Sequence, residues 1–294
     1  MKSEDTKVIA ETARVHVPVG DEIALRVEEL SKLFLPKNST PVLAMSKVSV
    51  EVRSQEVLAL LGPSGCGKST LLRVIGGLDT DYQGRVEWTS RSSEAGRLAT
   101  ATVFQQDSTL PWLNVSDNIA LGLSGLKLSK QERRDRVEQY SALVGLEHFR
   151  SSYPHELSGG MRQRVAIARA LAAEPHVLLM DEPLAALDAQ TRIVMQSELV
   201  AIWKRTGSTV VYVTHDIEEA VTLADRVIVM TARPGRIKSE RSVAIPRIGQ
   251  DGRLSEPLEL RAMPEFGQLA LALWSDLAEE VGSALSSERQ VSKQ

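Results

Sequence analysis

A glycine-rich stretch at residues 60–70 constrains this chain more than any other part of its sequence. It fills every fixed position of the pattern G-x-x-x-x-G-K-[ST]. The apolar run before it predicts a buried parallel strand, and the residues after it predict the first turns of a helix. A chance glycine-rich turn is the alternative, but a strand, this loop and a helix in that order indicate a loop that binds phosphates. The matching residues are Gly62, Gly67, Lys68 and Ser69.

The residue types in this stretch suit a chain of phosphates. Its glycines let backbone N–H groups approach an anion closely, because no Cβ stands in the way. The N-terminus of the following helix adds a partial positive charge. We expect the Lys68 ammonium to reach the phosphates and the Ser69 hydroxyl to bind Mg²⁺. The candidate nucleotide-binding residues are Gly62, Pro63, Ser64, Gly65, Cys66, Gly67, Lys68, Ser69 and Thr70.

Size, charge and hydropathy exclude several classes of protein. The chain has 294 residues, enough for one large domain with an appendage. Its 35 basic and 38 acidic side chains give a net charge of −3, which disfavours binding to nucleic acid. No apolar run reaches the roughly 18 residues that a membrane-spanning helix needs, and residues 1–20 lack the apolar core of a signal peptide. We therefore expect a cytoplasmic protein.

Cys66 is the only cysteine, which fits a reducing compartment. Backbone donors and Lys68 beside it predict a lowered thiol pKa and make Cys66 a candidate for alkylation that blocks the site. The alternative is a small filler residue, and this alternative is favoured for the mechanism.

The rest of the chain predicts three regions. Residues 1–22 are polar without a clear period and predict a flexible leader. Residues 23–235 predict the main domain, which opens with a small antiparallel sheet and contains an inserted helical subdomain at about 106–165. Residues 236–294 predict an extension with an amphipathic helix at about 264–284. Residues 262–288 contain no Lys or Arg, so we expect this helix to pack on the core or on a partner rather than on a membrane.

Apolar strands that alternate with helices predict a parallel sheet, with 226–230 as its last strand. Polar residues follow three of these strands: Gln105, the pair Asp181 and Glu182, and His215. Carboxyl ends of parallel strands meet at one edge of a sheet. We expect Asp181 to bind magnesium, Glu182 to polarise a water and His215 to contact the γ-phosphate. A solvated acidic turn and an ordinary histidine are the alternatives.

Two further features are ambiguous on their own. Ser158, Gly159 and Gly160 precede a helix and make a second possible anion site, although an ordinary helix cap explains them equally well. Phe34 precedes the phosphate loop and offers a ring on which a base can stack, although a lone phenylalanine is more often a core residue.

Five motifs in order give the chain a resemblance to the ATP-binding cassette (ABC) ATPases over residues 25–230. The resemblance implies an α/β fold: a P-loop NTPase (RecA-like) core with an N-terminal antiparallel β subdomain and an inserted α-helical subdomain. Met161, Phe34 and Gln55 depart from the family's commoner residues, but none of them removes a charged or catalytic group. The motifs are the phosphate loop, Gln105, residues 157–161, residues 177–182 and His215.

The resemblance also implies a head-to-tail dimer, formed with an identical chain or a paired ABC subunit. ATP and Mg²⁺ on residues 62–70 of one chain would be covered by Ser158, Gly159 and Gly160 of the other. Glu182 would be the general base, and Gln105 would join Ser69 and Asp181 at Mg²⁺. The remaining implied roles are catalysis by Lys68 and His215, adenine stacking by Phe34 and a dimer contact at Asp188.

Motifs around residues 103–123, 157–164 and 233–237 are similar to the nitrate, sulfonate and taurine importer branch. That resemblance implies transmembrane permease subunits as partners and a solute-binding protein acting indirectly. The permease is expected to dock near Leu110 and Trp112. The alternatives are a soluble cassette ATPase, an importer ATPase whose tail is regulatory and, more distantly, a phosphate-loop kinase.

Overall fold

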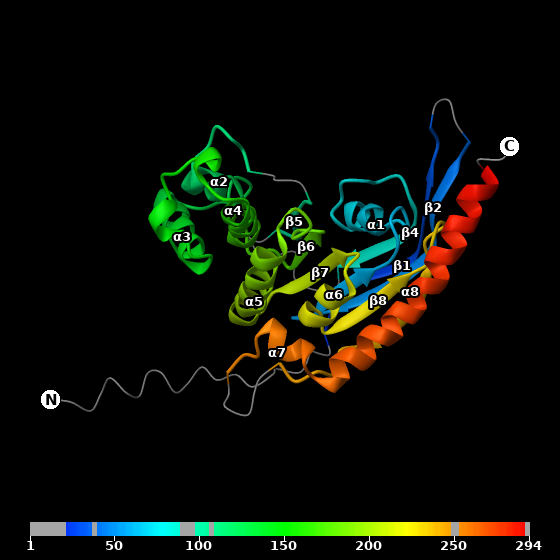
Figure 1. The fold of residues 1–294 in the computed structure, drawn as a ribbon. Helices are drawn as coiled ribbons and strands as arrows, with labels where there is room; N and C mark the ends of the chain where they lie inside the picture. The colour runs from blue at the N-terminus through cyan, green and yellow to red at the C-terminus, as the bar shows by residue number, and fades with distance from the viewer. Residues whose placement is uncertain (1–21, 37–39, 89–97, 106–108, 248–252, 292–294) are drawn as a thin grey trace.

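The computed structural model describes residues 22–36, 40–88, 98–105, 109–247 and 253–291 (Figure 1). Apart from Glu22, the predicted leader lies outside these residues. The described chain forms two sheets, a group of helices at one end and a long helix along the opposite side (Figure 1). The α/β class with an antiparallel subdomain, predicted from the sequence, is confirmed.

The larger sheet has six strands in the order β5-β6-β7-β3-β8-β9. The first five run parallel to one another, and β3 and β8 are buried along their whole length. Burial on both faces explains why β3 and β8 are almost entirely apolar in the sequence. Their bounds are β3 (Val57–Leu61), β5 (Thr100–Val103), β6 (Val177–Asp181), β7 (Thr209–Thr214) and β8 (Arg226–Met230).

The prediction that residues 226–230 form the last strand is wrong. A further strand, β9 (Ile237–Ser242), pairs antiparallel with β8 at the edge of the sheet. Its sequence is mostly polar because several of its side chains make ion pairs instead of entering the core. An edge strand of this kind lacks the apolar signal on which the prediction depended.

The smaller sheet has the order β2-β1-β4 and is antiparallel throughout. Its strands are β1 (Ile23–Phe34), β2 (Val42–Arg53) and β4 (Gln83–Trp88). Val27 faces Val50 on one neighbouring strand and Val86 on the other. The buried side of this sheet shares one apolar cluster with α1 (Lys68–Ile75), so it packs against the helix that follows the phosphate loop.

A group of helices stands apart at one end of the molecule (Figure 1). It comprises α2 (Val115–Leu121), α3 (Lys130–Leu143), the short 3-10 helices η1 (Glu147–Phe149) and η2 (Pro154–Glu156), and α4 (Gly159–Ala172). Helices α2, α3 and α4 pack on one another. The predicted end of this subdomain at 165 falls inside α4.

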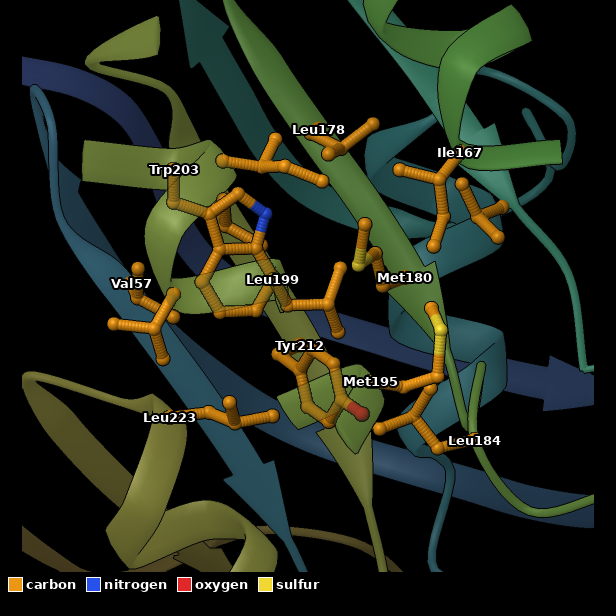
Figure 2. Packing of buried hydrophobic residues seen from close by; sticks show 14 of the residues in the cluster. Val57, Ile167, Leu178, Met180, Leu184, Met195, Leu199, Trp203, Tyr212 and Leu223 are labelled. Atoms are coloured by element: carbon orange, nitrogen blue, oxygen red, sulfur yellow. The ribbon is translucent and has the colours of Figure 1, made fainter. Parts of the chain in front are cut away.

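Helices α5 (Ala189–Thr206) and α6 (Ile217–Leu223) cover the central sheet. Figure 2 shows Leu199 and Trp203 of α5 packed over Tyr212 of β7. The rings of Trp203 and Tyr212 meet edge to face, with centroids 6.0 Å apart. This packing fixes the strand that ends immediately before His215.

The C-terminal region contains α7 (Pro257–Arg261) and α8 (Pro264–Val291), so α8 extends beyond the end at 284 predicted for the amphipathic helix. Phe266, Leu273 and Leu277 are buried, and α8 packs against α6 and β8. In the described part of the chain, no helix combines the length and apolar character needed to cross a membrane.

Candidate functional site

The phosphate loop depends on two glycines with positive φ. Gly65 has φ 75°, and Gly67, which precedes α1, has φ 103°. A Cβ added to Gly67 would lie 2.6 Å from Cγ of Met45, so both conformation and space require glycine there. No side chain caps the N-terminus of α1. Its first N–H groups are therefore presented by the backbone alone, as an anion site requires.

Lys68 begins α1 and is buried within the loop. Its ammonium donates to the carbonyl oxygens of Gly62 at 2.7 Å and Pro63 at 3.1 Å. The charge is thus held inside the loop by carbonyl dipoles. The ammonium thus lies inside the loop that the sequence predicts to bind phosphates, and its contact with them stays a prediction.

A hydroxyl and a carboxylate face each other across the start of α1. The Ser69 hydroxyl donates to Oδ1 of Asp181 at 2.9 Å, and Asp181 is the last residue of β6. Burial raises the pKa of Asp181, although the Ser69 hydrogen bond opposes this effect. Both side chains offer the hard oxygen ligands that Mg²⁺ prefers. Among the described residues, no group of three or more His, Cys, Asp or Glu side chains is arranged so that it could hold a metal ion. Mg²⁺ commonly keeps several waters and binds substrate phosphates together with few protein oxygens, so Ser69 and Asp181 fit this metal.

Glu182 lies at the centre of a three-residue cluster. Its Oε2 accepts from Nε2 of Gln105 at 3.1 Å and lies 3.1 Å from Nδ1 of His215. Glu182 is mostly buried, whereas the His215 side chain is 60% exposed. The backbone of Glu182 has φ 45°, a conformation that costs an ordinary residue free energy. The structure thus brings together the polar residues that follow β5, β6 and β7.

Behind this cluster lie two residues that the sequence analysis did not select. Oε1 of the buried Glu219 accepts from the Tyr212 hydroxyl at 2.9 Å, and its Oε2 accepts from the Thr214 hydroxyl. Burial raises the pKa of Glu219. Arg192 donates to the Leu187 carbonyl at 3.0 Å. Glu219 stands in the first turn of α6, where acidic residues are common, so its sequence position gave no special signal.

Arg192 and Glu219 border a small cavity next to the cluster of Gln105, Glu182 and His215. Its volume is about 30 Å³, and Glu182, Arg192, His215 and Glu219 are among its lining residues. A space of this size with several polar partners suits a single water molecule. Polar side chains therefore continue inward from the strand ends to Arg192 and Glu219.

The second predicted anion site lies elsewhere in the chain. The Ser158 hydroxyl caps α4 by accepting from the amide of Met161 at 3.3 Å. A Cβ added to Gly160 would lie 2.9 Å from Cγ2 of Thr191, so α4 begins close against α5. Figure 1 shows α4 grouped with α2 and α3, whereas α1 lies across β5 and β6 from it. The two anion sites are therefore on separate parts of one chain.

Two further predicted residues have clear positions. Phe34 ends β1 and is 42% exposed, with the ammonium of Lys32 at 5.0 Å from its ring centre. Asp188 is the N-cap of α5 and accepts from the amide of Thr191 at 3.0 Å.

The predicted lowering of the Cys66 pKa is wrong. Cys66 is buried, and this burial raises the pKa of its thiol more than nearby Lys68 lowers it. The side chain instead fills space beside the loop, where a Cβ on Gly62 would lie 2.9 Å from its sulfur. The structure thus favours the filler role over that of a reactive thiol.

A parallel sheet whose strand ends surround a glycine-rich phosphate loop defines the class of nucleotide-binding, phosphate-loop proteins. Comparison with known proteins narrows this class. Residues 45–185 match the family model described as ABC transporter. A taurine import ATP-binding protein of Rhizobium johnstonii is 43% identical over 83% of this chain and 93% of its own length. A nitrate import ATP-binding protein of Synechocystis sp. is 40% identical over 82% and 90% respectively.

A solved structure agrees with these relatives. It is described as the dimeric, post-hydrolysis state of an ATP-binding cassette bound to ADP and Pi. It is 32% identical to this chain, covers 74% of it and 98% of its own length, and has a TM-score of 0.63. The chain belongs to the ABC transporter family and is an ATP-binding subunit with ATPase activity. The resemblance to the nitrate, sulfonate and taurine branch is confirmed.

Proposed function

We propose that this chain hydrolyses ATP at the edge formed by β5, β6 and β7, with Glu182 as the general base. The observation that carries this proposal is the position of the Glu182 carboxylate, which is 3.1 Å from both Gln105 and His215. A carboxylate held by two polar side chains is suited to orienting a water and accepting its proton. Ser69 and Asp181, which are joined by a hydrogen bond, lie at the same edge of the sheet.

The proposed reaction is an in-line displacement at the γ-phosphorus. Water forms a bond to phosphorus as its proton passes to a carboxylate oxygen of Glu182, and the bond to the β,γ-bridging oxygen breaks to release ADP. Lys68 and the loop amides hold the phosphates, and His215 donates to the γ-phosphate. Ser69, Asp181 and the amide oxygen of Gln105 would hold Mg²⁺, which neutralises phosphate charge when bound.

We further propose that the site is completed by a second subunit, either an identical chain or a paired ABC subunit. The N-terminus of α4 carries Ser158, Gly159 and Gly160, and it lies apart from the phosphate loop of its own chain (Figure 1). A second chain placed head to tail brings this anion site onto the nucleotide. The dimeric description of the ATP-binding cassette at 32% identity supports this arrangement. Phe34, exposed at the end of β1, would stack on adenine.

The relatives' names support the role of an importer subunit at the cytoplasmic face of the cell membrane. Taurine, nitrate and aliphatic sulfonates are the solutes in those names, and small sulfonates or nitrate are therefore the proposed solute class. A permease would dock near Leu110 and Trp112, because the Trp112 side chain is 69% exposed. A separate solute-binding protein would act through that permease.

The variant Glu182→Gln tests the proposed base. It keeps the shape and the hydrogen bond to Gln105 but cannot accept a proton in the same way. We expect kcat to fall by about 100-fold or more and an ATP-bound dimer to accumulate in size-exclusion chromatography. Glu147→Gln is the matched control, because Glu147 is a half-exposed acid in η1, outside the site, and should leave kcat unchanged. Parent-like turnover in Glu182→Gln would reject the assignment.

A further inference from the structure

The turn after β8 touches the phosphate loop at Gly65 and Cys66. We call residues 231–236 the bracing turn. The guanidinium of Arg233 donates to the carbonyl of Gly65 at 3.4 Å. A Cβ added to Gly235 would lie only 1.9 Å from the carbonyl oxygen of Cys66, so the two backbones are in close contact. Any shift of the turn toward the loop must therefore move the loop.

The bracing turn is also fixed to the smaller sheet. The amide of Gly235 donates to the carbonyl of Ala44 at 2.8 Å, and the carbonyl of Gly235 accepts from the amide of Ser46 at 3.0 Å. Met45, which lies between these two residues, is the one whose side chain packs over Gly67. The turn is thus tied to the same short segment that limits space at the loop.

The C-terminal helix holds the other end of the bracing turn. Oε2 of Glu280 in α8 accepts from the amide of Ala232 at 2.9 Å, and Oε1 lies 2.9 Å from the Lys238 ammonium. Glu280 is only 16% exposed. Burial opposes its ionisation, but hydrogen bonds from Lys238 and Ala232 outweigh burial and lower the pKa of Glu280. The carboxylate therefore stays charged at neutral pH and accepts from the turn.

A second contact fixes the helix itself. Asp276 lies one turn before Glu280 in α8 and accepts from the Ser239 hydroxyl at 2.6 Å and from Arg241 at 2.9 Å. Both donors belong to β9. Helix α8 is thus held against the edge strand at Asp276 and reaches the turn with Glu280.

We propose that Glu280 is a positioning residue for nucleotide binding. By holding the amide of Ala232, it fixes the bracing turn against Gly65 and Cys66 and keeps the phosphate loop in its binding conformation. The C-terminal helix thereby sets the affinity of the site for ATP without touching the nucleotide. This inference rests on the proposal that residues 62–70 bind the nucleotide.

Three variants of the full chain separate this role from general stability. Glu280→Ala leaves the amide of Ala232 without its acceptor, whereas Glu280→Gln keeps an oxygen that can accept from it. Glu279→Ala is the matched control, because Glu279 also pairs with Lys238, at 2.6 Å, but is 76% exposed. Each is measured with a fluorescent methylanthraniloyl ATP and Mg²⁺, by steady-state ATPase kinetics and by hydrogen exchange of residues 62–70.

We expect Glu280→Ala to raise both the Kd for the analogue and the KM for ATP by about three- to ten-fold, with kcat within about two-fold. Amide exchange in the phosphate loop should increase in the same variant. Glu280→Gln should restore most of the affinity, and Glu279→Ala should match the parent. Parent-like affinity in Glu280→Ala, or equal losses in Glu279→Ala and Glu280→Ala, would overturn the proposal.

Lys68→Ala in the same binding assay distinguishes this inference from the proposed function. Weaker binding in Lys68→Ala together with parent-like binding in Glu280→Ala rejects the positioning role alone. Unchanged binding in Lys68→Ala rejects the phosphate-loop assignment and, with it, the role of Glu280. A lower melting temperature accompanied by unchanged Kd in Glu280→Ala would show that the contact serves stability only and would also reject the proposal.

Discussion

The two helix N-termini that the sequence marks as anion sites are built differently. Helix α1 starts from Gly67 in a left-handed conformation, has no side-chain cap and places Lys68 inside the loop. Helix α4 starts from Ser158 in an extended conformation, and the Ser158 hydroxyl caps its amide groups. The first end is a cradle of backbone N–H groups that holds its own cation, Lys68, whereas the second is a helix end capped by a side chain.

This difference suggests that the N-termini of α1 and α4 have different functions. The α1 cradle has the residues to bind nucleotide in a single chain, because cation, amides and the Asp181 carboxylate converge there. At the α4 end the capping group is the neutral Ser158 hydroxyl, and Arg162 in the first turn donates to the carbonyl of Leu157 at 2.7 Å. We expect changes at the cradle to affect binding itself and changes at α4 to affect turnover in the dimer.

The largest effect is expected from Gly67→Ala. The new methyl group would combine a φ of 103° with a 2.6 Å approach to Met45, and the cradle must open to relieve both. We expect kcat/KM for ATP to fall by on the order of 100-fold or more. Steady-state ATPase assays and nucleotide titration measure this loss.

Gly77→Ala is the control for that prediction. Gly77 also has a positive φ, of 69°, but no atom lies within 4 Å of the position of its added Cβ. It follows α1 instead of preceding it, so its strain of about 1–2 kcal/mol should lower the melting temperature without weakening ATP binding. Equal losses of affinity in the two variants would show that backbone strain alone, and not the shape of the cradle, explains the result.

A smaller effect is expected from Ser158→Ala. Loss of a hydrogen bond to a charged phosphate should lower the kcat of the dimer by about 10- to 100-fold, while ATP binding to a single chain is retained. Ser129→Ala is matched to it, because Ser129 caps α3 by the same hydroxyl-to-amide bond. Both changes should cost about 1 kcal/mol of stability through the lost cap. If kcat falls by the same factor in Ser158→Ala and Ser129→Ala, then Ser158 serves only as a helix cap.

The sequence predicted the residues of the phosphate loop and the strand ends better than it predicted the residues that hold them in place. The loop, Gln105, Asp181, Glu182 and His215 lie at strand ends or within two residues of them, so the strand pattern and the rule for parallel sheets place them at one edge. Such local patterns also predicted β3 and, at about 106–165, the helical region that contains α2.

The residues that hold the site in place were missed because they act through contacts between distant segments. Glu280 meets Ala232 across 48 residues of sequence, and β9 is joined to α8 through polar side chains. Glu219 and Arg192 resemble ordinary helical surface residues until the fold places them behind His215. A polar contact between distant segments leaves no period in the sequence, whereas a buried strand does.

The raised pKa of Asp181 gives a further test, which concerns only the site around the phosphate loop. Burial raises the pKa of Asp181 above its value in the unfolded chain, so its ionised form disfavours folding. We expect Asp181→Asn to be more stable than the parent in the absence of nucleotide and Mg²⁺ at neutral pH. The difference should vanish below the unfolded pKa, where the carboxyl is protonated in both states, and should grow as pH rises through the folded pKa. Urea unfolding across this pH range measures it, and a variant less stable than the parent at pH 7 would contradict the prediction.

The smallest effect is expected from Met161→Gln, at the α4 side. Met161 supplies the amide that Ser158 caps, and its partly buried side chain packs against the core cluster. Glutamine, which is commoner in the family here, keeps the amide and the length of the side chain. We therefore expect turnover within about two-fold of the parent and a stability loss of about 1 kcal/mol from the partly buried polar group. A change of kcat beyond ten-fold would show that the side chain at 161 acts on the partner's nucleotide, and the α4 end would then bind through more than its backbone and Ser158.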